Sequence, residues 1–166
     1  MEDKKVVPTE QMVAKIKAAV AAREKRDFFI LARTDAIDPE GVDAAIQRGE
    51  EYLKAGADGV YLEGPTSETQ LKRIGKAFKG EQLATSVLEN GGKTPWLAPE
   101  QFAEMGYTMI LYPTTLLFRA AWAIQRAAKD LRAGKPLDRD QSVNMKEFLK
   151  LVELEHWQDI EKEFTP

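Results

Sequence analysis

Apolar and polar positions along this chain follow two periods, one typical of buried strands and one typical of helices. Residues 28–32 are apolar without interruption, and the charged residues Arg33 and Asp35 follow them directly. A short apolar run with this ending predicts a strand, residues 28–33, that is buried on both faces and carries its polar groups at its carboxyl end. Because side chains two residues apart on a strand point to the same side, Arg33 and Asp35 are expected to face together beyond the sheet.

The rest of the chain repeats a unit of helix, glycine and strand. The predicted helices span residues 8–24, 38–56, 67–80, 99–106 and 115–133, and the predicted strands span residues 28–33, 59–63, 82–88 and 108–112. Four helical stretches end in a glycine, which ends a helix in the left-handed conformation at no steric cost. These glycines are Gly56, Gly80, Gly106 and Gly134. The alternation predicts an α/β fold with a parallel sheet of four strands, either a small open sheet or half of a (β/α)8 TIM barrel.

Two of the helix starts carry specific signals. Asp38 can accept hydrogen bonds from free helix amides and Pro39 suits a first turn, so residues 38–56 are predicted as one helix. Ser67 and Gln70 have the spacing of a capping box at the start of the third helix.

The chain is predicted to consist of two parts. Residues 1–140 form the βα units of the half-barrel, and residues 141–166 form a helical tail. Apolar residues recur through this tail between Phe148 and Phe164, so it is expected to pack on a neighbouring subunit. The unpaired edges of a four-stranded sheet also invite association, and the expected assembly is a dimer or tetramer.

Composition excludes several classes of protein. The 166 residues contain 43% hydrophobic residues, enough for one sizeable core. A net charge of -3 without a block of Lys or Arg argues against a nucleic-acid surface but leaves small anionic metabolites as ligands. The absence of cysteine excludes disulfides, thiolate metal sites and a thiol nucleophile within this chain. No apolar run approaches the roughly 20 residues of a membrane span, and no signal peptide is evident, so a cytoplasmic protein is expected.

Polar residues follow the ends of the predicted strands. In a parallel sheet these ends meet at one edge, so residues far apart in sequence converge there. Arg33 offers a fork of donors for a carboxylate or phosphonate, and Glu63 can hold a metal-bound water or take a proton. The alternative is that Arg33 and Glu63 only neutralise one another as a structural ion pair. The strand-end residues are Arg33 with Asp35, Glu63, Ser86 with Glu89, and Pro113.

A glycine-rich stretch, residues 91–95, resembles a phosphate-binding loop only weakly. It lacks the leading glycine at P-loop spacing, and no long helix opens directly after Lys93. A flexible active-site loop after the third strand is the preferred interpretation. The lone His156, in the helical tail, is more often structural than catalytic in such a setting.

Several stretches occur together in the order and spacing of a known family. They are residues 30–36 (ILARTDA), 52–63 (YLKAGADGVYLE), 92–95 (GKTP), 105–107 (MGY) and 112–113 (YP). They resemble the isocitrate lyase and phosphoenolpyruvate mutase superfamily, in its carboxyphosphonoenolpyruvate phosphonomutase, oxaloacetate decarboxylase and methylisocitrate lyase-like branch. The resemblance covers nearly the whole chain but only the second half of the family's barrel, strands five to eight with the C-terminal helices.

The resemblance implies a Mg²⁺-dependent lyase or phosphonomutase. Members of this family cleave or form C–C or P–C bonds in 2-hydroxy and 2-oxo acids through an enolate-like species. By resemblance, Arg33 binds the carboxylate or phosphonate of the substrate, and Glu63 lies in the outer shell of the metal, with Asp35 as a weaker candidate. The loop after the third strand then closes over the substrate. The implied substrate-binding residues are Arg33, Ser86, Glu89, Asn90, Gly91, Gly92, Lys93, Thr94 and Pro113.

Two departures from the family pattern leave alternatives open. Ser86 stands where the family has an asparagine, for which Asn90 is the candidate replacement, and the half of the barrel with the metal-binding aspartates and gating loop is missing. The first hypothesis is an enzyme, either as part of a longer protein or as two chains that complete a barrel. The second is a non-catalytic half-barrel that oligomerises or binds an anionic metabolite. The third is a flavodoxin-like open sheet, although no glycine-rich loop follows its first strand.

Overall fold

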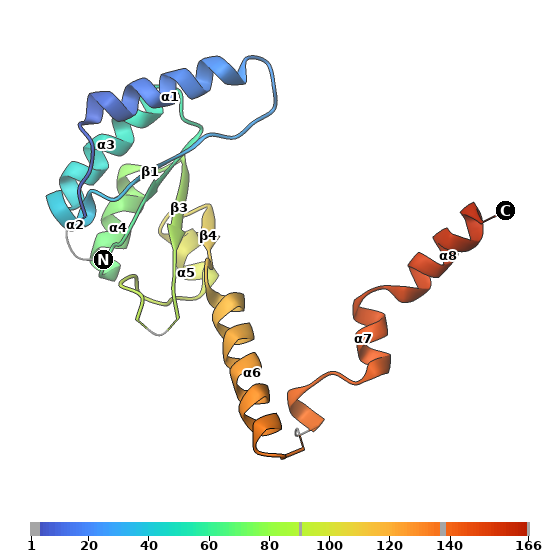
Figure 1. Ribbon diagram of the computed structural model, residues 1–166. Helices are drawn as coiled ribbons and strands as arrows, with labels where there is room; N and C mark the ends of the chain where they lie inside the picture. Colours follow the sequence, from blue (N-terminus) through green and yellow to red (C-terminus); the bar gives the residue numbers. More distant parts are fainter. Residues whose placement is uncertain (1–3, 90, 137–138, 166) are drawn as a thin grey trace. The chain divides into compact units, whose positions relative to one another are not determined.

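The computed structural model describes residues 4–89, 91–136 and 139–165 (Figure 1). The chain divides into two compact units, Met1–Leu116 and Leu117–Pro166. The first unit alternates helices and strands along its sequence. Its elements are α1 (Thr9–Arg23), β1 (Leu31–Thr34), α2 (Ile37–Glu40), α3 (Val42–Lys54), β2 (Gly59–Leu62), α4 (Glu68–Ala77), β3 (Gln82–Ser86), α5 (Pro99–Glu104) and β4 (Met109–Leu111).

The four strands of the first unit form one parallel sheet in the order β1-β2-β3-β4. Arg33 lies opposite Tyr61, and Tyr61 lies opposite Ala84. Side chains in register on parallel strands point to the same face, so these three residues form a row across the sheet. The prediction of an α/β fold with a four-stranded parallel sheet is therefore confirmed.

The opposite face of the sheet packs on the helices. Alternate residues of the strands, such as Val60, Leu62 and Leu83, point into the apolar core and are at most 2% exposed. Full burial of such side chains stabilises the fold by about 1.5–3 kcal/mol each. Helix α3 packs on β1, β2 and α1.

The first strand differs from its prediction. It begins at Leu31 instead of Phe28, and Phe28 and Phe29 are 66% and 47% exposed. Only the side of the strand that carries Ala32 and Thr34 is buried, whereas Arg33 is exposed. The expectation of burial on both faces was wrong because β1 is at the edge of the sheet, so Arg33 has a neighbouring strand on one side only, whereas Tyr61 on β2, in the same row, is buried.

The predicted helix over residues 38–56 is two helices. Gly41 separates α2 from α3 with a φ of 88°, a conformation that side-chain-bearing residues rarely adopt. Asp38 lies inside α2 and caps neither helix, so its predicted role was wrong. Half of the predicted capping box is present: Ser67 Oγ accepts a hydrogen bond from the Gln70 amide at 3.3 Å, but Gln70 Oε1 accepts from the Thr66 amide, at 2.7 Å, instead of the Ser67 amide.

The second unit is helical. It contains most of α6 (Thr115–Arg132), then η1 (Arg139–Gln141), α7 (Met145–Leu151) and α8 (Leu154–Phe164). The predicted tail is thus two helices, which meet at Glu153, where φ is 52°. Several large apolar side chains of this unit are at least 60% exposed, namely Leu117, Trp122, Ile124, Leu131, Met145, Leu151, Trp157 and Phe164. Among the described residues, no helix combines the length and apolarity that crossing a membrane requires.

Candidate functional site

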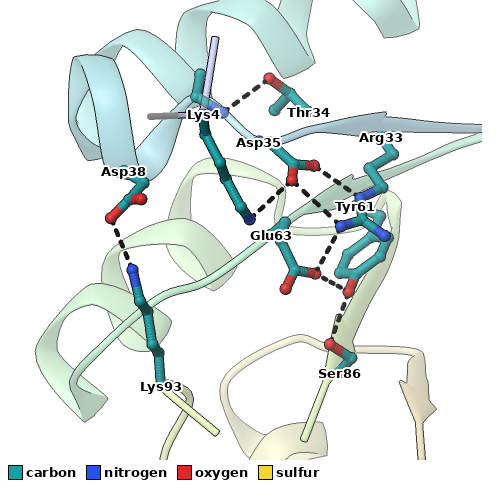
Figure 2. Close-up of polar contacts among 10 residues, drawn as sticks. Lys4, Arg33, Thr34, Asp35, Asp38, Tyr61, Glu63, Ser86 and Lys93 are labelled. Atoms are coloured by element: carbon teal, nitrogen blue, oxygen red, sulfur yellow. Dashed lines mark hydrogen bonds and ion pairs between the residues drawn. The ribbon is translucent and has the colours of Figure 1, made fainter. Parts of the chain in front are cut away.

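Charged side chains meet at the carboxyl ends of β1 and β2 (Figure 2). The Arg33 guanidinium donates from Nε to Asp35 Oδ1 at 2.7 Å and from Nη2 to Asp35 Oδ2 at 3.3 Å. The same Nη2 lies 3.5 Å from Glu63 Oε2. Arg33 and Asp35 therefore face together, as the two-residue spacing predicts, and the adjacent strand adds Glu63.

The segment before α1 brings a second cation to this cluster. Lys4 Nζ donates to Asp35 Oδ2 at 2.9 Å. The hydrogen bond from Arg33, assisted by Lys4, holds the pKa of Asp35 below its usual range despite partial burial. The hydrogen bond to Asp35 in turn raises the pKa of Arg33. Both ions of the pair are thus held in their charged forms.

Tyr61 joins the cluster from the face of the sheet that bears Arg33. Its side chain is 6% exposed, and its hydroxyl hydrogen-bonds Glu63 Oε2 and, at 2.6 Å, Ser86 Oγ. The carbon at the centre of the Arg33 guanidinium lies 5.0 Å from the centroid of the Tyr61 ring, within the range of a cation–π interaction. Burial, together with the hydrogen bond to Glu63, raises the pKa of Tyr61 to about 12, so the phenol stays protonated at neutral pH.

The loop after β3 meets the same place. A cavity of about 240 Å³ is lined by Lys4, Glu63, Gly91, Gly92, Lys93 and Thr94, among others. Lys93 Nζ pairs with Asp38 Oδ1 at 2.8 Å, which ties the loop to α2 and lowers the pKa of Asp38. The loop and Glu63 thus share one cavity, whose lining among the described residues does not include Arg33, Asp35 or Ser86.

The other predicted site residues fall in different places. Ser86 lies at the end of β3 and reaches the cluster through Tyr61, while Glu89 belongs to the loop. Asn90 lies outside the described residues. Pro113 follows β4 and is exposed, and it does not line the cavity among the residues described. Whether any of these residues binds a ligand stays a prediction.

A larger hollow, of about 870 Å³, lies between α7 and α8 and includes His156. These two helices contain no buried residue, and among the described residues no ion pair joins the side chains that line the hollow. We therefore favour the smaller cavity beside Glu63 as the functional site.

Sequence analysis missed Tyr61 and Lys4 as members of the site. Tyr61 precedes Glu63 by two residues, so the strand period places both on the same side of β2 and would have identified it. Lys4 is separated from Asp35 by 31 positions, and no local pattern links them.

The described side chains do not form a complete Mg²⁺ site. In the described parts of the chain, no three or more His, Asp or Glu side chains gather around a common point. Asp35, Asp38 and Glu63 are carboxylates at or beside the cavity, and each is already engaged by a cation or by Tyr61. Mg²⁺ requires several oxygen ligands in near-octahedral geometry, so these groups alone do not fit it.

Comparison with known proteins gives consistent matches. A sequence model of the family described as phosphoenolpyruvate phosphomutase matches residues 1–132. The chain is 39% identical to the petal death protein of Dianthus caryophyllus over 100% of its own length and 53% of that protein. It is 38% identical to 2,3-dimethylmalate lyase of Eubacterium barkeri, over 99% of this chain and 57% of the lyase.

Solved structures agree with these matches. Oxaloacetate acetylhydrolase in complex with the inhibitor 3,3-difluorooxalacetate superposes with a TM-score of 0.88 at 28% identity, over 98% of this chain and 55% of that one. A structure of 2,3-dimethylmalate lyase superposes with a TM-score of 0.83, also at 28% identity, over 95% and 57%. The chain therefore spans about half the length of the relatives it matches.

Proposed function

Because the chain belongs to the phosphoenolpyruvate phosphomutase family, we propose that it carries the substrate-holding half of a lyase or phosphonomutase site. The proposed substrates are small 2-hydroxy or 2-oxo acids that react through an enolate-like species. The observation that carries the proposal is the Arg33 guanidinium, which is 51% exposed beside Glu63 where two parallel strands end. Relatives of the chain are named as lyases of small carboxylates, such as 2,3-dimethylmalate lyase.

The arginine has a donor to spare for a ligand. In the described part of the chain, its contacts with Asp35 and Glu63 use Nε and Nη2, which leaves Nη1 for a carboxylate or phosphonate oxygen. A charge-assisted hydrogen bond of this kind both binds the anion and stabilises negative charge that develops on it. Asp35 fixes the plane of the guanidinium, so the spare donor has a defined direction.

The divalent cation expected from the family has no complete site among these residues. When bound, such a cation supplies charge neutralisation to a developing enolate oxygen. We infer that its ligands come from a second half-barrel, whether on another polypeptide or in a longer form of the protein. Asp35 and Glu63 then contribute at most through the outer shell.

A turnover assay tests the proposal. Mg²⁺-dependent cleavage of oxaloacetate, 2-methylisocitrate and 2,3-dimethylmalate is measured for the chain and for Arg33→Ala. Loss of one positioned donor for developing charge lowers turnover by about 10²–10³-fold. Arg73→Ala is the matched control, since Arg73 is an exposed arginine paired with Asp43 away from the cavity. Turnover no greater than that of Arg33→Ala, together with equal binding of oxalate by the two proteins, would overturn the proposed role of this site.

A second candidate is a non-catalytic half-barrel that binds an anionic metabolite or associates with itself. Its support is the half-length match, the lack of a three-ligand metal group among described residues, and the exposed apolar side chains of α6 to α8. A dimer or tetramer is the proposed assembly, and light scattering that finds a folded monomer at micromolar concentration would contradict it. Oxalate binding without turnover would favour this candidate over the enzyme.

A cytoplasmic location and the absence of nucleic-acid partners stay predictions from sequence.

A further inference from the structure

We propose that Tyr61 is the positioning residue of this site: its buried hydroxyl fixes the Glu63 carboxylate, and its ring supports the Arg33 guanidinium. Tyr61 thereby determines which atoms of Glu63 and Arg33 are left for a ligand. The nature of that ligand, a small carboxylate, rests on the proposed function. The arrangement of the three side chains rests on the geometry alone.

The sheet register places Tyr61 at the centre of the site. It lies opposite Arg33 on β1 and opposite Ala84 on β3, so its ring occupies the middle of the row across the sheet. From there the hydroxyl reaches forward to Glu63 on its own strand and sideways to Ser86 on the next. Figure 2 shows Tyr61 between Arg33, Glu63 and Ser86. Tyr61 is therefore the residue that links the ends of three strands.

The donor and the acceptor in each of these two hydrogen bonds follow from the hydrogens that the groups carry. A phenol has one hydrogen, and an ionised carboxylate can only accept, so Tyr61 donates to Glu63 Oε2. The Ser86 hydroxyl must then supply the hydrogen for its own contact with Tyr61, at 2.6 Å. Both hydroxyl-bearing residues are nearly buried, at 6% and 5% exposure, so water cannot easily replace either bond. The relay thus points in one direction, from Ser86 through Tyr61 to Glu63.

This relay occupies one oxygen of Glu63 and spares the other. Among the described residues, the contacts of the Glu63 side chain with Tyr61 and Arg33 both end on Oε2. Oε1 is left to accept a hydrogen bond from a ligand, in the cavity that Glu63 lines. Loss of the Tyr61 hydroxyl would leave Oε2 only its 3.5 Å contact with Arg33, so the carboxylate would be held less firmly.

The ring of Tyr61 orients the Arg33 guanidinium, as its hydroxyl orients the Glu63 carboxylate. A half-exposed arginine side chain is flexible, yet here the guanidinium is held both by Asp35 and over the Tyr61 ring, 5.0 Å from its centroid. Substitution of Tyr61 by phenylalanine keeps this ring and removes only the hydroxyl. The two functions of the side chain can therefore be separated.

Tyr107 shows how a tyrosine with a purely structural role looks in the same unit. It is 5% exposed, packs edge-on against Phe102 in the core, and its hydroxyl donates to the backbone oxygen of Leu71 at 3.3 Å. No charged group takes part in that contact. Tyr107→Phe is thus a control with the same chemical change at equal burial, away from the cavity.

The first arm of the test needs no ligand. The full chain is labelled with ¹³C at the glutamate side-chain carboxyls, and Glu63→Gln identifies the Glu63 resonance. At pH 7 we expect Tyr61→Phe to shift the Glu63 resonance more than that of any other glutamate, and Tyr107→Phe to leave it in place. Ser86→Ala, which removes the donor to Tyr61, is expected to shift the same resonance by a smaller amount. A Glu63 resonance that is unmoved in Tyr61→Phe would overturn the proposal.

The second arm measures oxalate binding by calorimetry. We expect Tyr61→Phe to weaken binding about tenfold, since a hydrogen bond to a charged group is lost, and Tyr107→Phe to change it less than about twofold. Because Ser86 acts through Tyr61, the double variant Tyr61→Phe/Ser86→Ala should bind no more weakly than Tyr61→Phe. Equal affinity of the wild type and Tyr61→Phe would overturn the proposal. Failure of the wild type to bind oxalate would instead contradict the proposed ligand class, and the Glu63 resonance then decides the role of Tyr61.

Discussion

Replacement of Glu40 by alanine tests whether Arg48 holds the segment before α1, which contains Lys4 and Val7, against α2. Arg48, on α3, is 8% exposed and donates to Glu40 from Nε at 2.8 Å and from Nη2 at 2.9 Å. Its third donor, Nη1, binds the backbone oxygen of Val7 at 2.8 Å. Val7 belongs to the segment that carries Lys4 to Asp35, so Arg48 anchors α2 and this segment together.

The expected cost follows from these contacts. A hydrogen bond to a charged group contributes about 1.5–3 kcal/mol, and breaking a fully buried ion pair costs about 3–5 kcal/mol. The Glu40 side chain is 36% exposed, so water replaces part of what Arg48 loses. Glu40→Ala should therefore lower the free energy of unfolding by about 2–3 kcal/mol. The hydrogen bond to Glu40 raises the pKa of Arg48. Because a guanidinium stays protonated in proteins even without such a partner, Glu40→Ala leaves the nearly buried Arg48 charge unpaired at this site.

Urea unfolding of the full chain at pH 7 measures this cost. Glu51→Ala is the control, because Glu51 pairs with Lys54 at 2.7 Å on the exposed surface of α3, the helix that carries Arg48. That pair should contribute less than about 0.5 kcal/mol. Hydrogen exchange at the Val7 amide and its neighbours should increase in Glu40→Ala and not in Glu51→Ala. If the two variants lose equal stability, the Arg48 cluster does not anchor the segment.

Two further perturbations test other parts of the first unit. Because the pKa of Asp35 is lowered in the folded state, its ion pairs stabilise the fold at pH values above 3.8, and this contribution is lost as the pH falls through the folded pKa. The difference in unfolding free energy between wild type and Asp35→Asn should thus be constant above about pH 5 and shrink on acidification; a difference independent of pH down to pH 2 would contradict this. Gly75→Ala would place a Cβ 1.7 Å from the backbone oxygen of Met105, and the overpacking cost of about 3 kcal/mol should exceed the roughly 1 kcal/mol that alanine gains in a helix. An unchanged or raised melting temperature in Gly75→Ala would show that α4 and the backbone at Met105 can move apart at little cost.

Local sequence patterns predicted the features that depend on neighbours along the chain: helix ends, the side of a strand on which a side chain lies, and the direction of the strands. The glycines at the helix ends have the expected positive φ values, for example 100° at Gly56 and 97° at Gly106. Arg33 and Asp35 face together because a strand period of two requires it. The parallel order of the strands follows in the same way from the alternation of helix and strand.

The sequence could not predict what depends on contacts across the fold. Phe28 and Phe29 extend an apolar run, but burial depends on a neighbouring strand or helix that β1 lacks on one side. The backbone before Leu31 is fixed by the Asp58 carboxylate, which accepts from the Ile30 amide at 2.7 Å. The contact of Lys4 with Asp35 likewise depends on how α1 and its preceding segment pack, which residue spacing does not encode.

The two interpretations of Arg33, structural ion pair and ligand-binding group, are separated by comparison with Arg48. Arg48 is nearly buried, and its Nε, Nη1 and Nη2 atoms each have an acceptor within the fold, so its contacts serve stability. Arg33 is half exposed and uses only two of its nitrogens among the described residues, so its pairs with Asp35 and Glu63 contribute about 0–1 kcal/mol. An ion pair that adds so little to stability, yet leaves a spare donor next to Glu63, which lines the cavity, serves orientation better than folding. Arg33→Ala should therefore cost less stability than Glu40→Ala while it weakens oxalate binding more, and the reverse order would assign Arg33 to the structural role.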